Sequence, residues 1–546
     1  MPVFFRIFIA IILVAGLNAA KASGQAPVKV VKKGSVAGKV TIKGKAAAGV
    51  TIAVRTSDFS NGFEPTYKAV TDLQGLYRVN DIPAGNYQIS TVAAAYVTVN
   101  EPTRKIVVLN EGEAVEGIDF SLVRGGVITG KVTDADGRPV IELRVNLVRA
   151  DIPPNQRNRL SIASTMPTDD RGIYRMFGIP AGRYKVAVGQ GPDSFFSSVS
   201  TGRPVYKETF HPDVNDYDKA SVIEVTEGSE SSNVDISLGR ATQTFTASGR
   251  VVNGENGEPV GNLRFGLRQI TENRGGAFIS SQALSNSQGQ FVAENLIPGK
   301  YAIFILPMMN NPLRGDAVTF EIVDQDVKDL VVTTSKGVTL SGVVVVENTE
   351  DRAILARLSQ FQVQGFVQSQ APGGNIGHSA TINGDGSFQM TGLESGVAYL
   401  SLGSYNDSNV KSFNLVRTEK DGIPQPQGVE IKNTDISGVR LVVAYGSGTL
   451  RGQVNVINGS IPANGRILLR LTKPGETNSR LRPPTVDSRG HFIVEGLPVG
   501  VYDVAASVFV PGVRTEASTA KQQVTITDEN TTDLILNLDL GQKPNP

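Results

Sequence analysis

Apolar residues alternate with polar ones in short stretches along most of the chain. The clearest stretches each begin at a tyrosine: Tyr87-x-Ile89, Tyr184-x-Val186-x-Val188, Tyr301-x-Ile303-x-Ile305 and Tyr502-x-Val504. A period of two with one apolar face is typical of a half-buried antiparallel strand. We find no convincing amphipathic helix, which would need a period of 3.6. The pattern therefore predicts an all-β protein.

A block of 17 residues recurs and contains the start of each of these strands. It runs TDLQGLYRVNDIPAGNY from Thr71 to Tyr87, TDDRGIYRMFGIPAGRY from Thr168 to Tyr184, SNSQGQFVAENLIPGKY from Ser285 to Tyr301, and VDSRGHFIVEGLPVGVY from Val486 to Tyr502. A looser copy, INGDGSFQMTGLESGVAY, occupies residues 382–399. The first glycines of successive copies are 97, 117, 97 and 104 residues apart. This spacing matches one immunoglobulin-like sandwich of ~100 residues.

Four positions of the block have predicted structural roles. The first glycine suits a turn with positive φ, the aromatic two residues later points inward, a second glycine turns the chain, and a tyrosine opens the next strand. In chain order these residues are Gly75, Tyr77, Gly85, Tyr87; Gly172, Tyr174, Gly182, Tyr184; Gly289, Phe291, Gly299, Tyr301; Gly386, Phe388, Gly396, Tyr399; and Gly490, Phe492, Gly500, Tyr502. In the fourth copy the tyrosine comes one residue late.

The end of the block resembles a tyrosine corner, in which the tyrosine hydroxyl bonds back to the backbone a few residues upstream. We therefore interpret these tyrosines as structural. The alternative is that they form a stacking platform for a sugar.

The repeats divide the chain into five tandem Greek-key sandwiches of an immunoglobulin-like or prealbumin-like kind, with about seven strands each. The predicted domains are 35–125, 126–240 with an insertion loop, 241–337, a divergent 338–447, and 448–541. The joins contain no Ser/Pro-rich linker, so flexible linkers are not expected. Placed end to end, the sandwiches would form an elongated array of roughly 125–165 Å, at ~3.3 Å per strand residue.

The full pattern resembles the carboxypeptidase regulatory-like domain, a transthyretin-like or starch-binding-like β-sandwich. The second repeat carries the whole hallmark: Gly130, Val132, Gly137, Pro139, Thr168, Asp169, Gly172, Tyr174, Pro180, Gly182 and Tyr184. The resemblance covers nearly the whole chain after its first residues. The resemblance implies exported, non-catalytic accessory modules with a carbohydrate-binding-like fold. It is also compatible with carbohydrate binding.

The first 22 residues have the layout of a signal peptide. Arg6 is followed by an apolar run of 11 residues and then by the cleavage pattern Ala20-Lys21-Ala22. The alternative is a membrane anchor, which would need ~20 apolar residues. No later run of ~18 apolar residues is present, so we expect no membrane span in the mature chain. We expect a periplasmic or secreted protein.

The amino-acid composition excludes several kinds of site. The chain has no Cys, no Trp and three His, and its 53 basic residues balance 52 acidic ones. Without cysteine there can be no disulfide and no thiolate ligand or nucleophile, so each domain must be held by core packing. A net charge of +1 offers no signature for binding nucleic acid. We expect no cofactor.

An insertion in the second repeat, from Gly189 to Ala220, is the main candidate for binding. It concentrates six aromatic or imidazole side chains: Phe195, Phe196, Tyr206, Phe210, His211 and Tyr217. They could stack on a sugar or grip a peptide, or alternatively cap the open edge of their own sandwich. It also holds Asp213, Asp216 and Asp218, which either bind Ca²⁺ or form a solvated turn.

No paired catalytic motif is present in the sequence. The first hypothesis is thus an exported, non-enzymatic spacer or interaction module. The second is a carbohydrate-binding protein that uses the insertion of the second repeat. An enzyme is the weakest hypothesis, because the repeats occupy the chain. The partner is an unknown protein or polysaccharide of the cell envelope.

Overall fold

The computed structural model describes residues 32–57, 65–99, 104–151, 162–189, 204–270, 278–279, 284–308, 311–369, 375–403, 412–462, 465–476, 481, 483–510 and 519–541. Over these ranges the strands form ten sheets. The sheets face each other in pairs across five large hydrophobic clusters, so each pair is a β-sandwich. The all-β prediction is confirmed. We number the sandwiches in chain order, and the predicted domain boundaries stay predictions.

The first sandwich packs the sheet β2-β1-β10-β7, to which β5 and β9 are joined through β1, against the sheet β4-β3-β6-β8. Its strands are β1 Gly34–Ile42, β2 Lys45–Ala46, β3 Thr51–Thr56, β4 Tyr67–Val70, β5 Leu76–Ile82, β6 Gly85–Val92, β7 Tyr96–Thr98, β8 Arg104–Leu109, β9 Ala114–Val115 and β10 Phe120–Arg124. Ile52, Ile89 and Phe120 are buried between the two sheets.

The second sandwich packs β14-β11-β18, with β19 joined to β11, against β13-β12-β15-β16, with β17 joined to β15. Its elements are β11 Gly126–Thr133, β12 Arg144–Arg149, β13 Ile162–Pro167, β14 Ile173–Ile179, β15 Gly182–Val188, β16 Thr209–Phe210, the 3₁₀-helix η3 Tyr217–Lys219, β17 Ile223–Val225, β18 Glu230–Ser231 and β19 Ile236–Ser237.

The third sandwich packs β23-β20-β27-β25 against β22-β21-β24-β26. Its strands are β20 Phe245–Asn253, β21 Phe265–Ile270, β22 Phe278–Ile279, β23 Gln290–Leu296, β24 Gly299–Ile305, β25 Leu313–Gly315, β26 Val318–Ile322 and β27 Val327–Lys336. The rings of Phe265 and Phe291 meet across its core at 5.3 Å.

The fourth sandwich packs β31-β28-β36-β33-β34 against β30-β29-β32-β35. Its elements are β28 Val338–Val346, α2 Arg352–Ala356, η4 Arg357–Gln360, β29 Gln362–Gln368, β30 Ile376–Thr381, β31 Ser387–Leu393, β32 Gly396–Gly403, β33 Phe413–Lys420, β34 Ile423–Pro424, β35 Val429–Ile431 and β36 Ile436–Tyr445. The periodicity of the sequence did not predict α2. Asp351 caps this short helix by accepting from the Ala353 amide at 2.8 Å, and Ile354 and Leu355 pack on the core.

The fifth sandwich packs β39-β37-β42 against β38-β40-β41. Its strands are β37 Gly448–Ile457, β38 Arg466–Thr472, β39 His491–Leu497, β40 Gly500–Phe509, β41 Thr519–Ile526 and β42 Thr531–Asp539. As in the other four sandwiches, the first strand pairs in parallel with the last: β1 with β10, β11 with β19, β20 with β27, β28 with β36, and β37 with β42.

Four of the block tyrosines have the geometry of a tyrosine corner. The hydroxyls of Tyr87, Tyr184, Tyr301 and Tyr502 donate to the backbone carbonyls of Pro83, Pro180, Ile297 and Pro498, each four residues upstream, over 2.7–3.0 Å. Burial raises the pKa of Tyr502 to about 12, so its hydroxyl keeps its proton and remains a donor.

Tyr399 differs from these four tyrosines. It does not have the structural role that the sequence predicted. The extra residue in the fourth copy moves Tyr399 by one strand position, and Ala398 takes the buried place. Because successive side chains of a strand point to opposite faces, Tyr399 lies on the outer face and is 44% exposed.

Three of the joins between consecutive sandwiches are short and tightly packed. Only Gly125 separates β10 from β11, only Gly337 separates β27 from β28, and only Gly446 and Ser447 separate β36 from β37. The amides of the three glycines donate to the carbonyls of Ala95, Pro312 and Ser412 in the preceding sandwich, over 2.7–3.0 Å. Each join therefore adds contacts between sandwiches to the covalent connection.

Another glycine of the block, six positions after its first glycine, faces each of these joins. Gly178, Gly392 and Gly496 have φ of 66–73°. A Cβ on Gly178 would overlap the carbonyl oxygen of Ala94 in the first sandwich, so only glycine fits here. The first and third sandwiches, which have no such join before them, carry Asp81 and Asn295 at this position.

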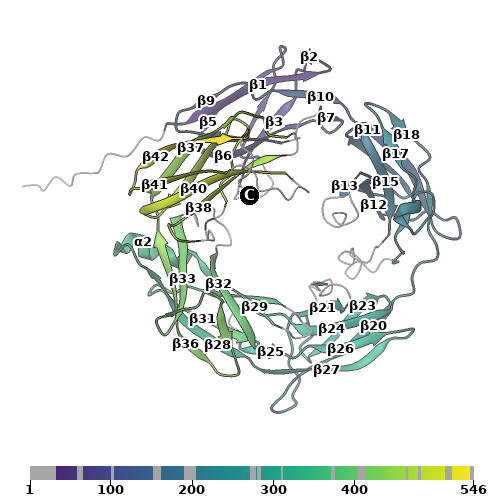
Figure 1. The fold of residues 1–546 in the computed structure, drawn as a ribbon. Coiled ribbons are helices and arrows are strands. Elements are labelled where there is room, and N and C mark those ends of the chain that lie inside the picture. Colours follow the sequence, from purple (N-terminus) through teal and green to yellow (C-terminus); the bar gives the residue numbers. More distant parts are fainter. Residues whose placement is uncertain are drawn as a thin grey trace, which may run out of the picture.

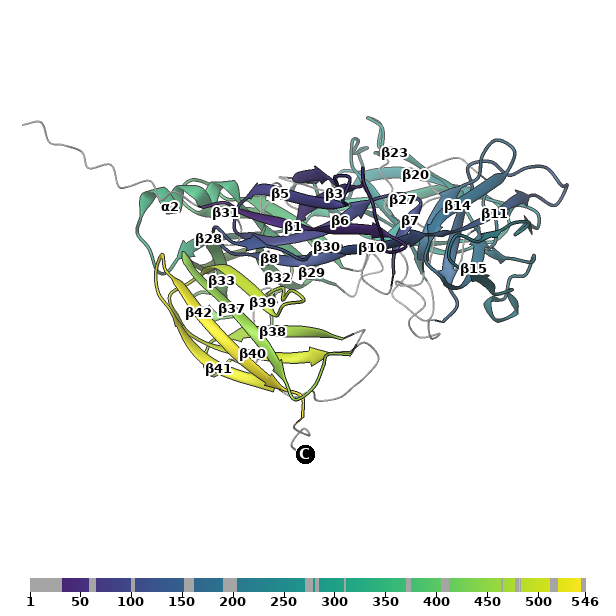
Figure 2. The ribbon, with the colours of Figure 1, turned by 90° about the horizontal axis from the view of Figure 1, so that it is seen from above.

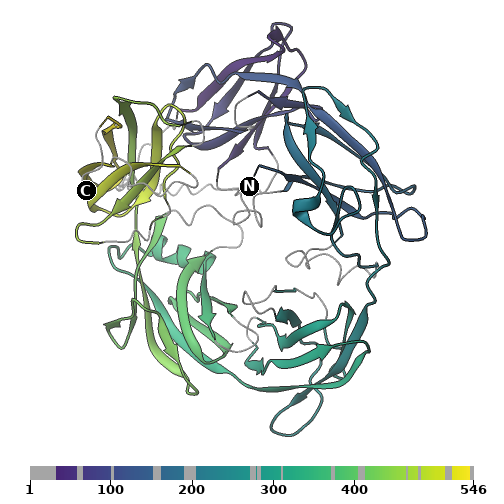
Figure 3. The ribbon, with the colours of Figure 1, turned by 45° about the vertical axis from the view of Figure 1, so that its right-hand side comes forward.

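The chain curves into a ring, and its last sandwich lies beside its first (Figure 1). The strand β39 of the fifth sandwich lies next to β8 of the first, and Figure 3 shows the same closure from another side. Figure 2 shows that the fifth sandwich is displaced out of the layer formed by the others. The expected elongated array is therefore wrong: the joins bend the chain consistently in one direction, and hydrogen bonds between the first and fifth sandwiches close it.

Within the described residues, no helix has both the length and the apolar character needed to cross a membrane.

Candidate interaction sites

The described part of the insertion in the second sandwich turns toward its own sheet. Its strand β16 pairs with β15 and forms an edge of the sheet, with Phe210 opposite Ala187. Tyr206 is 8% exposed and packs into the core, and Phe210 is 5% exposed. These two rings are therefore packed into their own sandwich, as the edge-cap alternative predicts. They are not exposed to a ligand. Phe195 and Phe196 lie outside the described residues.

The other two candidates of the insertion hold its turn in place. The ring of Tyr217 meets that of Phe210 edge-on at 5.6 Å, and the Lys185 ammonium lies 3.9 Å from the centre of the Tyr217 ring. Lys185 also donates to the Tyr217 carbonyl at 2.5 Å, and His211 Nδ1 donates to the Asp235 carbonyl at 2.7 Å. The buried cation is thus stabilised by a ring face and a carbonyl.

The three aspartates of the insertion are not gathered into a metal site. Asp213 accepts from the Ser237 amide at 2.6 Å, and Asp216 caps η3 by accepting from the Asp218 amide at 3.0 Å. Among all described residues, no group of three His, Asp or Glu side chains could hold a metal ion. Asp213 and Asp216 stabilise the turn through the backbone instead.

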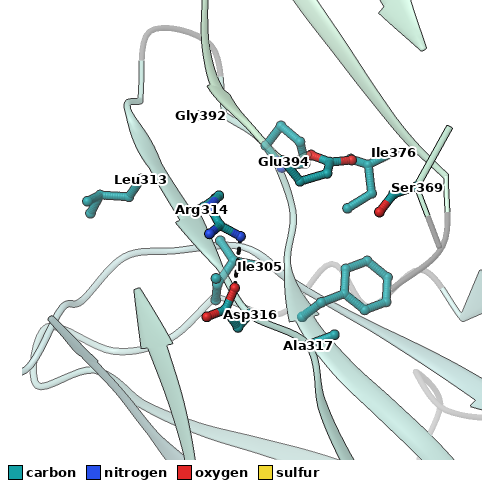
Figure 4. Close-up of a pocket in the computed structure, with 12 residues that line it drawn as sticks. Ile305, Leu313, Arg314, Asp316, Ala317, Ser369, Ile376, Gly392 and Glu394 are labelled. Carbon is teal, nitrogen blue, oxygen red and sulfur yellow. Dashed lines mark hydrogen bonds and ion pairs between the residues drawn. The ribbon is translucent and has the colours of Figure 1, made fainter. Parts of the chain in front are cut away.

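A small cavity lies at the join of the third and fourth sandwiches (Figure 4). Ile305, Leu313 and Ile376 supply apolar walls, and the Arg314–Asp316 ion pair of 2.8 Å lies at its side. Glu394 also lines it: one carboxylate oxygen is 3.1 Å from Nε2 of buried His378, and the other is buried without a hydrogen-bond partner. A volume of about 60 Å³ has room for a few water molecules and not for a sugar ring.

The contact that closes the ring joins a turn of the fifth sandwich to the edge strand β8 of the first. The amide of Val108 in β8 donates to Asp487 Oδ2 at 3.2 Å, and Arg489 Nη2 donates to the Val108 carbonyl at 2.7 Å. Two side chains thus satisfy the backbone groups that an unpaired edge strand would leave open. Asn86 adds a contact of 3.5 Å to the carbonyl of Ile493.

Charges at this contact are paired and largely buried. Arg489 donates to Asp487 Oδ2 at 2.8 Å and to Glu113 Oε1 at 3.0 Å, and the side chain of Asp487 is only 1% exposed. Burial alone would raise the pKa of Glu113, but hydrogen bonds from Asn110 and Arg489 outweigh it and hold this pKa below its usual range. We name these residues, Val108, Glu113, Asp487 and Arg489, the closing contact.

Sequence reasoning did not find the closing contact. Asp487 and Arg489 belong to the block turn of the fifth repeat, where the pattern predicts only a turn. Their partners Val108 and Glu113 are more than 370 residues away in the chain. The D-x-R-G sequence of this turn is the one available signal, and the second repeat carries it as well, at Asp169 to Gly172.

No protein-family model and no curated protein matches the chain. Solved structures that resemble it include three from bacterial proteins. The Bacillus anthracis TIE protein is 16% identical over 56% of this chain and 51% of its own, so the chain spans about half of that protein, with a TM-score of 0.16. A streptococcal ancillary pilin is 11% identical over 56% of this chain and 99% of its own, with a TM-score of 0.24. The shaft pilin SpaA of Lactobacillus rhamnosus GG is 11% identical over 39% of this chain and 98% of its own, with a TM-score of 0.19. Similarities this weak support no conclusion about function.

Proposed function

We propose that this chain is an exported, non-enzymatic protein of the cell envelope, built of carboxypeptidase regulatory-like repeats, that serves as a rigid structural and interaction module. Residues 1–22 direct its export in this proposal, and the mature protein is periplasmic or secreted. Its partners are a protein or a polysaccharide of the envelope.

The closing contact is the observation that carries this proposal. A spacer needs only its covalent joins, and its two ends are free to separate. Here the ends are joined through a guanidinium that reaches a backbone carbonyl and two carboxylates, one of which is almost fully buried. Paired, buried charges of this kind specify one arrangement, because breaking them leaves an uncompensated charge. The module thus holds several sandwiches at fixed positions.

The three glycine joins support the same conclusion. Carbonyl-to-amide hydrogen bonds across each join restrict the angle between neighbouring sandwiches. The join between the second and third sandwiches is longer, with residues 238–244 between β19 and β20, and the Thr242 amide donates to the Val205 carbonyl at 2.7 Å. This longer join is therefore also attached to the sandwich before it.

Small-angle scattering of the mature protein tests the proposal. We expect a maximum dimension well below the roughly 125–165 Å of an end-to-end array, and a distance distribution with the form of a ring. A rod-like profile of the longer dimension would contradict a rigid closed module. The control is the chain without its fifth sandwich, residues 448–541, which should lose the ring profile.

A carbohydrate-binding role for the insertion of the second repeat has less support. Of its described aromatic rings, Tyr206 and Phe210 are buried against their own sandwich.

A further inference from the structure

One pair of aromatic side chains is exposed side by side on a sheet. Phe366 in β29 and Tyr399 in β32 are direct partners in the antiparallel register, and they are 48% and 44% exposed. Side chains in this relation have Cβ atoms about 5 Å apart. The other aromatic side chains among the exposed large residues of the described chain are Tyr96, Phe177 and Phe509. Tyr96 and Phe509 have arginines, Arg124 and Arg466, as strand partners.

The pair exists because the fourth repeat departs from the pattern of the others. The one-residue shift that removes Tyr399 from the corner position places it beside Phe366. On its other side Phe366 faces Gly377 in β30, where nothing lies within 4 Å of an added Cβ. The aromatic pair is therefore open to solvent at this flank.

Amide and hydroxyl groups border the pair along the same face. Gln364 pairs with Ser379 on one side and Ser401 on the other, in the row next to the aromatic pair. Gln362 pairs with Thr381 in the row beyond, and Gln368 lies in the row on the opposite side. Among the described strands the register places one charged residue on this face, Glu430 opposite Val397, and Lys432 neutralises it in an ion pair of 3.2 Å.

The surface of the fifth sandwich that corresponds to this face is different. There Phe509 is opposite Arg466, with the guanidinium 5.1 Å from the ring centre, and Asp503 and Lys521 form an ion pair of 3.1 Å. The near absence of charge around Phe366 and Tyr399 is thus not a general property of these sheets. It disfavours a polyanion or an acidic peptide as the partner.

We propose that Phe366 and Tyr399 form a binding platform for a neutral polysaccharide. A sugar ring has an apolar C–H face, which stacks on an aromatic ring, and hydroxyls at its edge, which bond to amides and hydroxyls. The Gln and Ser side chains around the pair offer such groups in rows on two sides. The sheet that carries the platform lies on the inner side of the ring, with β28, β31 and β36 outside it (Figure 1).

This proposal rests on the proposed function for a polysaccharide of the envelope as the partner, names the class of that polysaccharide, and does not depend on ring closure. A chain whose ends separated would still carry the aromatic pair, because both residues belong to the fourth sandwich. A failure of the scattering test and a failure of the binding test are thus distinct.

Affinity electrophoresis and calorimetry with amylose, laminarin and hydroxyethyl cellulose test the platform. We expect the wild-type protein to bind at least one of these neutral glucans, and Phe366→Ala or Tyr399→Ala to weaken binding about tenfold each. Tyr399→Phe keeps the ring and should retain most of the affinity. Phe509→Ala, at an exposed aromatic of similar accessibility, is the matched control and should leave binding unchanged.

Three outcomes would overturn the platform. They are no binding of any of the three glucans by the wild type, equal binding by the Phe366→Ala/Tyr399→Ala double variant, and an equal loss in Phe509→Ala. Because both side chains are exposed, the double variant should melt within about 2 °C of the wild type, and circular dichroism shows whether it has folded. Selective capture of a protein by the platform with no glucan bound would likewise replace the polysaccharide as the partner.

Discussion

The second and fifth repeats contain the same turn, D-x-R-G, in two different surroundings. In both, the first aspartate accepts from the amides two and four residues later: Asp169 from Arg171 and Ile173, and Asp487 from Arg489 and His491, over 2.7–2.9 Å. In both, the arginine pairs with the aspartate, at 3.1 and 2.8 Å. Arg171 is 72% exposed, whereas Arg489 is 29% exposed and binds the edge of the first sandwich.

The difference between the two turns is one of environment and not of local structure. An ion pair in water is worth little, because solvent screens it and the side chains lose freedom in forming it. The same pair in a contact between sandwiches becomes costly to break, since each partner would be left buried with its charge unpaired. One local motif therefore serves as a solvated turn in one repeat and as a structural lock in another.

Among the substitutions that test this comparison, replacing Arg489 should have the largest effect on the closing contact. Arg489→Ala leaves Asp487 buried and Glu113 without its cation, and we expect the closing contact to lose about 3 kcal/mol. Because the native chain has no cysteine, Leu73→Cys and Thr525→Cys can be spin-labelled selectively on the first and fifth sandwiches. The distance distribution between the labels should broaden in Arg489→Ala. An unchanged narrow distribution would show that the contact does not hold the ring.

Substitution of Gly178 tests the tight join in front of the second repeat. Gly178→Ala places a Cβ against the Ala94 carbonyl and forces alanine into a left-handed conformation, which should cost about 2 kcal/mol. Asp81→Ala, at the corresponding left-handed position of the first repeat, is the matched control and should cost less than half as much. Chemical denaturation measures both, and equal losses would mean that the join itself contributes nothing.

Low pH should weaken the closing contact through protonation of Glu113. Its pKa in the closed ring lies below its usual range, in part because of Arg489, so the stabilisation that Arg489 gives is present at neutral pH. That contribution is lost as the pH falls below about 4, through the ordinary range of a glutamate and then its lowered value. The label distance should broaden in this window in the wild type, and Glu113→Gln should show a smaller transition, because only Asp487 remains as a carboxylate of the contact. A pH-independent distance down to pH 3 would contradict the role given to Glu113.

The exposed copy of the turn should give the smallest effect. Arg171→Ala removes only a solvated ion pair, and we expect almost no loss of stability and no change in the label distance. A thermal melt beside that of Arg489→Ala makes the comparison direct. If the two variants lost equal stability, the environment of the turn would not matter and the comparison would fail.

The local parts of the fold could be predicted from single segments of sequence. Alternation behind Tyr87, Tyr184, Tyr301 and Tyr502 predicted strands, and the Gly-x-Tyr spacing predicted the bond from each hydroxyl to the upstream carbonyl. The added residue of the fourth copy was visible as well, but Tyr399 was still expected in a structural role, and the strand register then placed it on the outer face. Neighbours within a strand or turn decide all of these features.

The candidate sites depend on residues that the chain brings together from far apart. The sequence left two alternatives open for the insertion, a ligand-binding surface and an edge cap. It could not decide between them for Phe210, because its partners Ala187 and Ala220 pack against it only when β16 joins the sheet. Phe366 likewise has no local relation to Tyr399, 33 residues later. A search for clustered aromatics in sequence therefore selected the buried group and missed the exposed pair.

The sequence by itself determined the repeated sandwich unit and its pinned corner, since turns, alternation and a hydroxyl four residues from its acceptor are local properties. Only the tertiary structure decided that the units close into a ring and which of two identical turns became the lock. Closure depends on the angle at every join added together, and on an edge strand meeting Asp487 and Arg489 from the other end of the chain. Such a sum of orientations is encoded by no single segment.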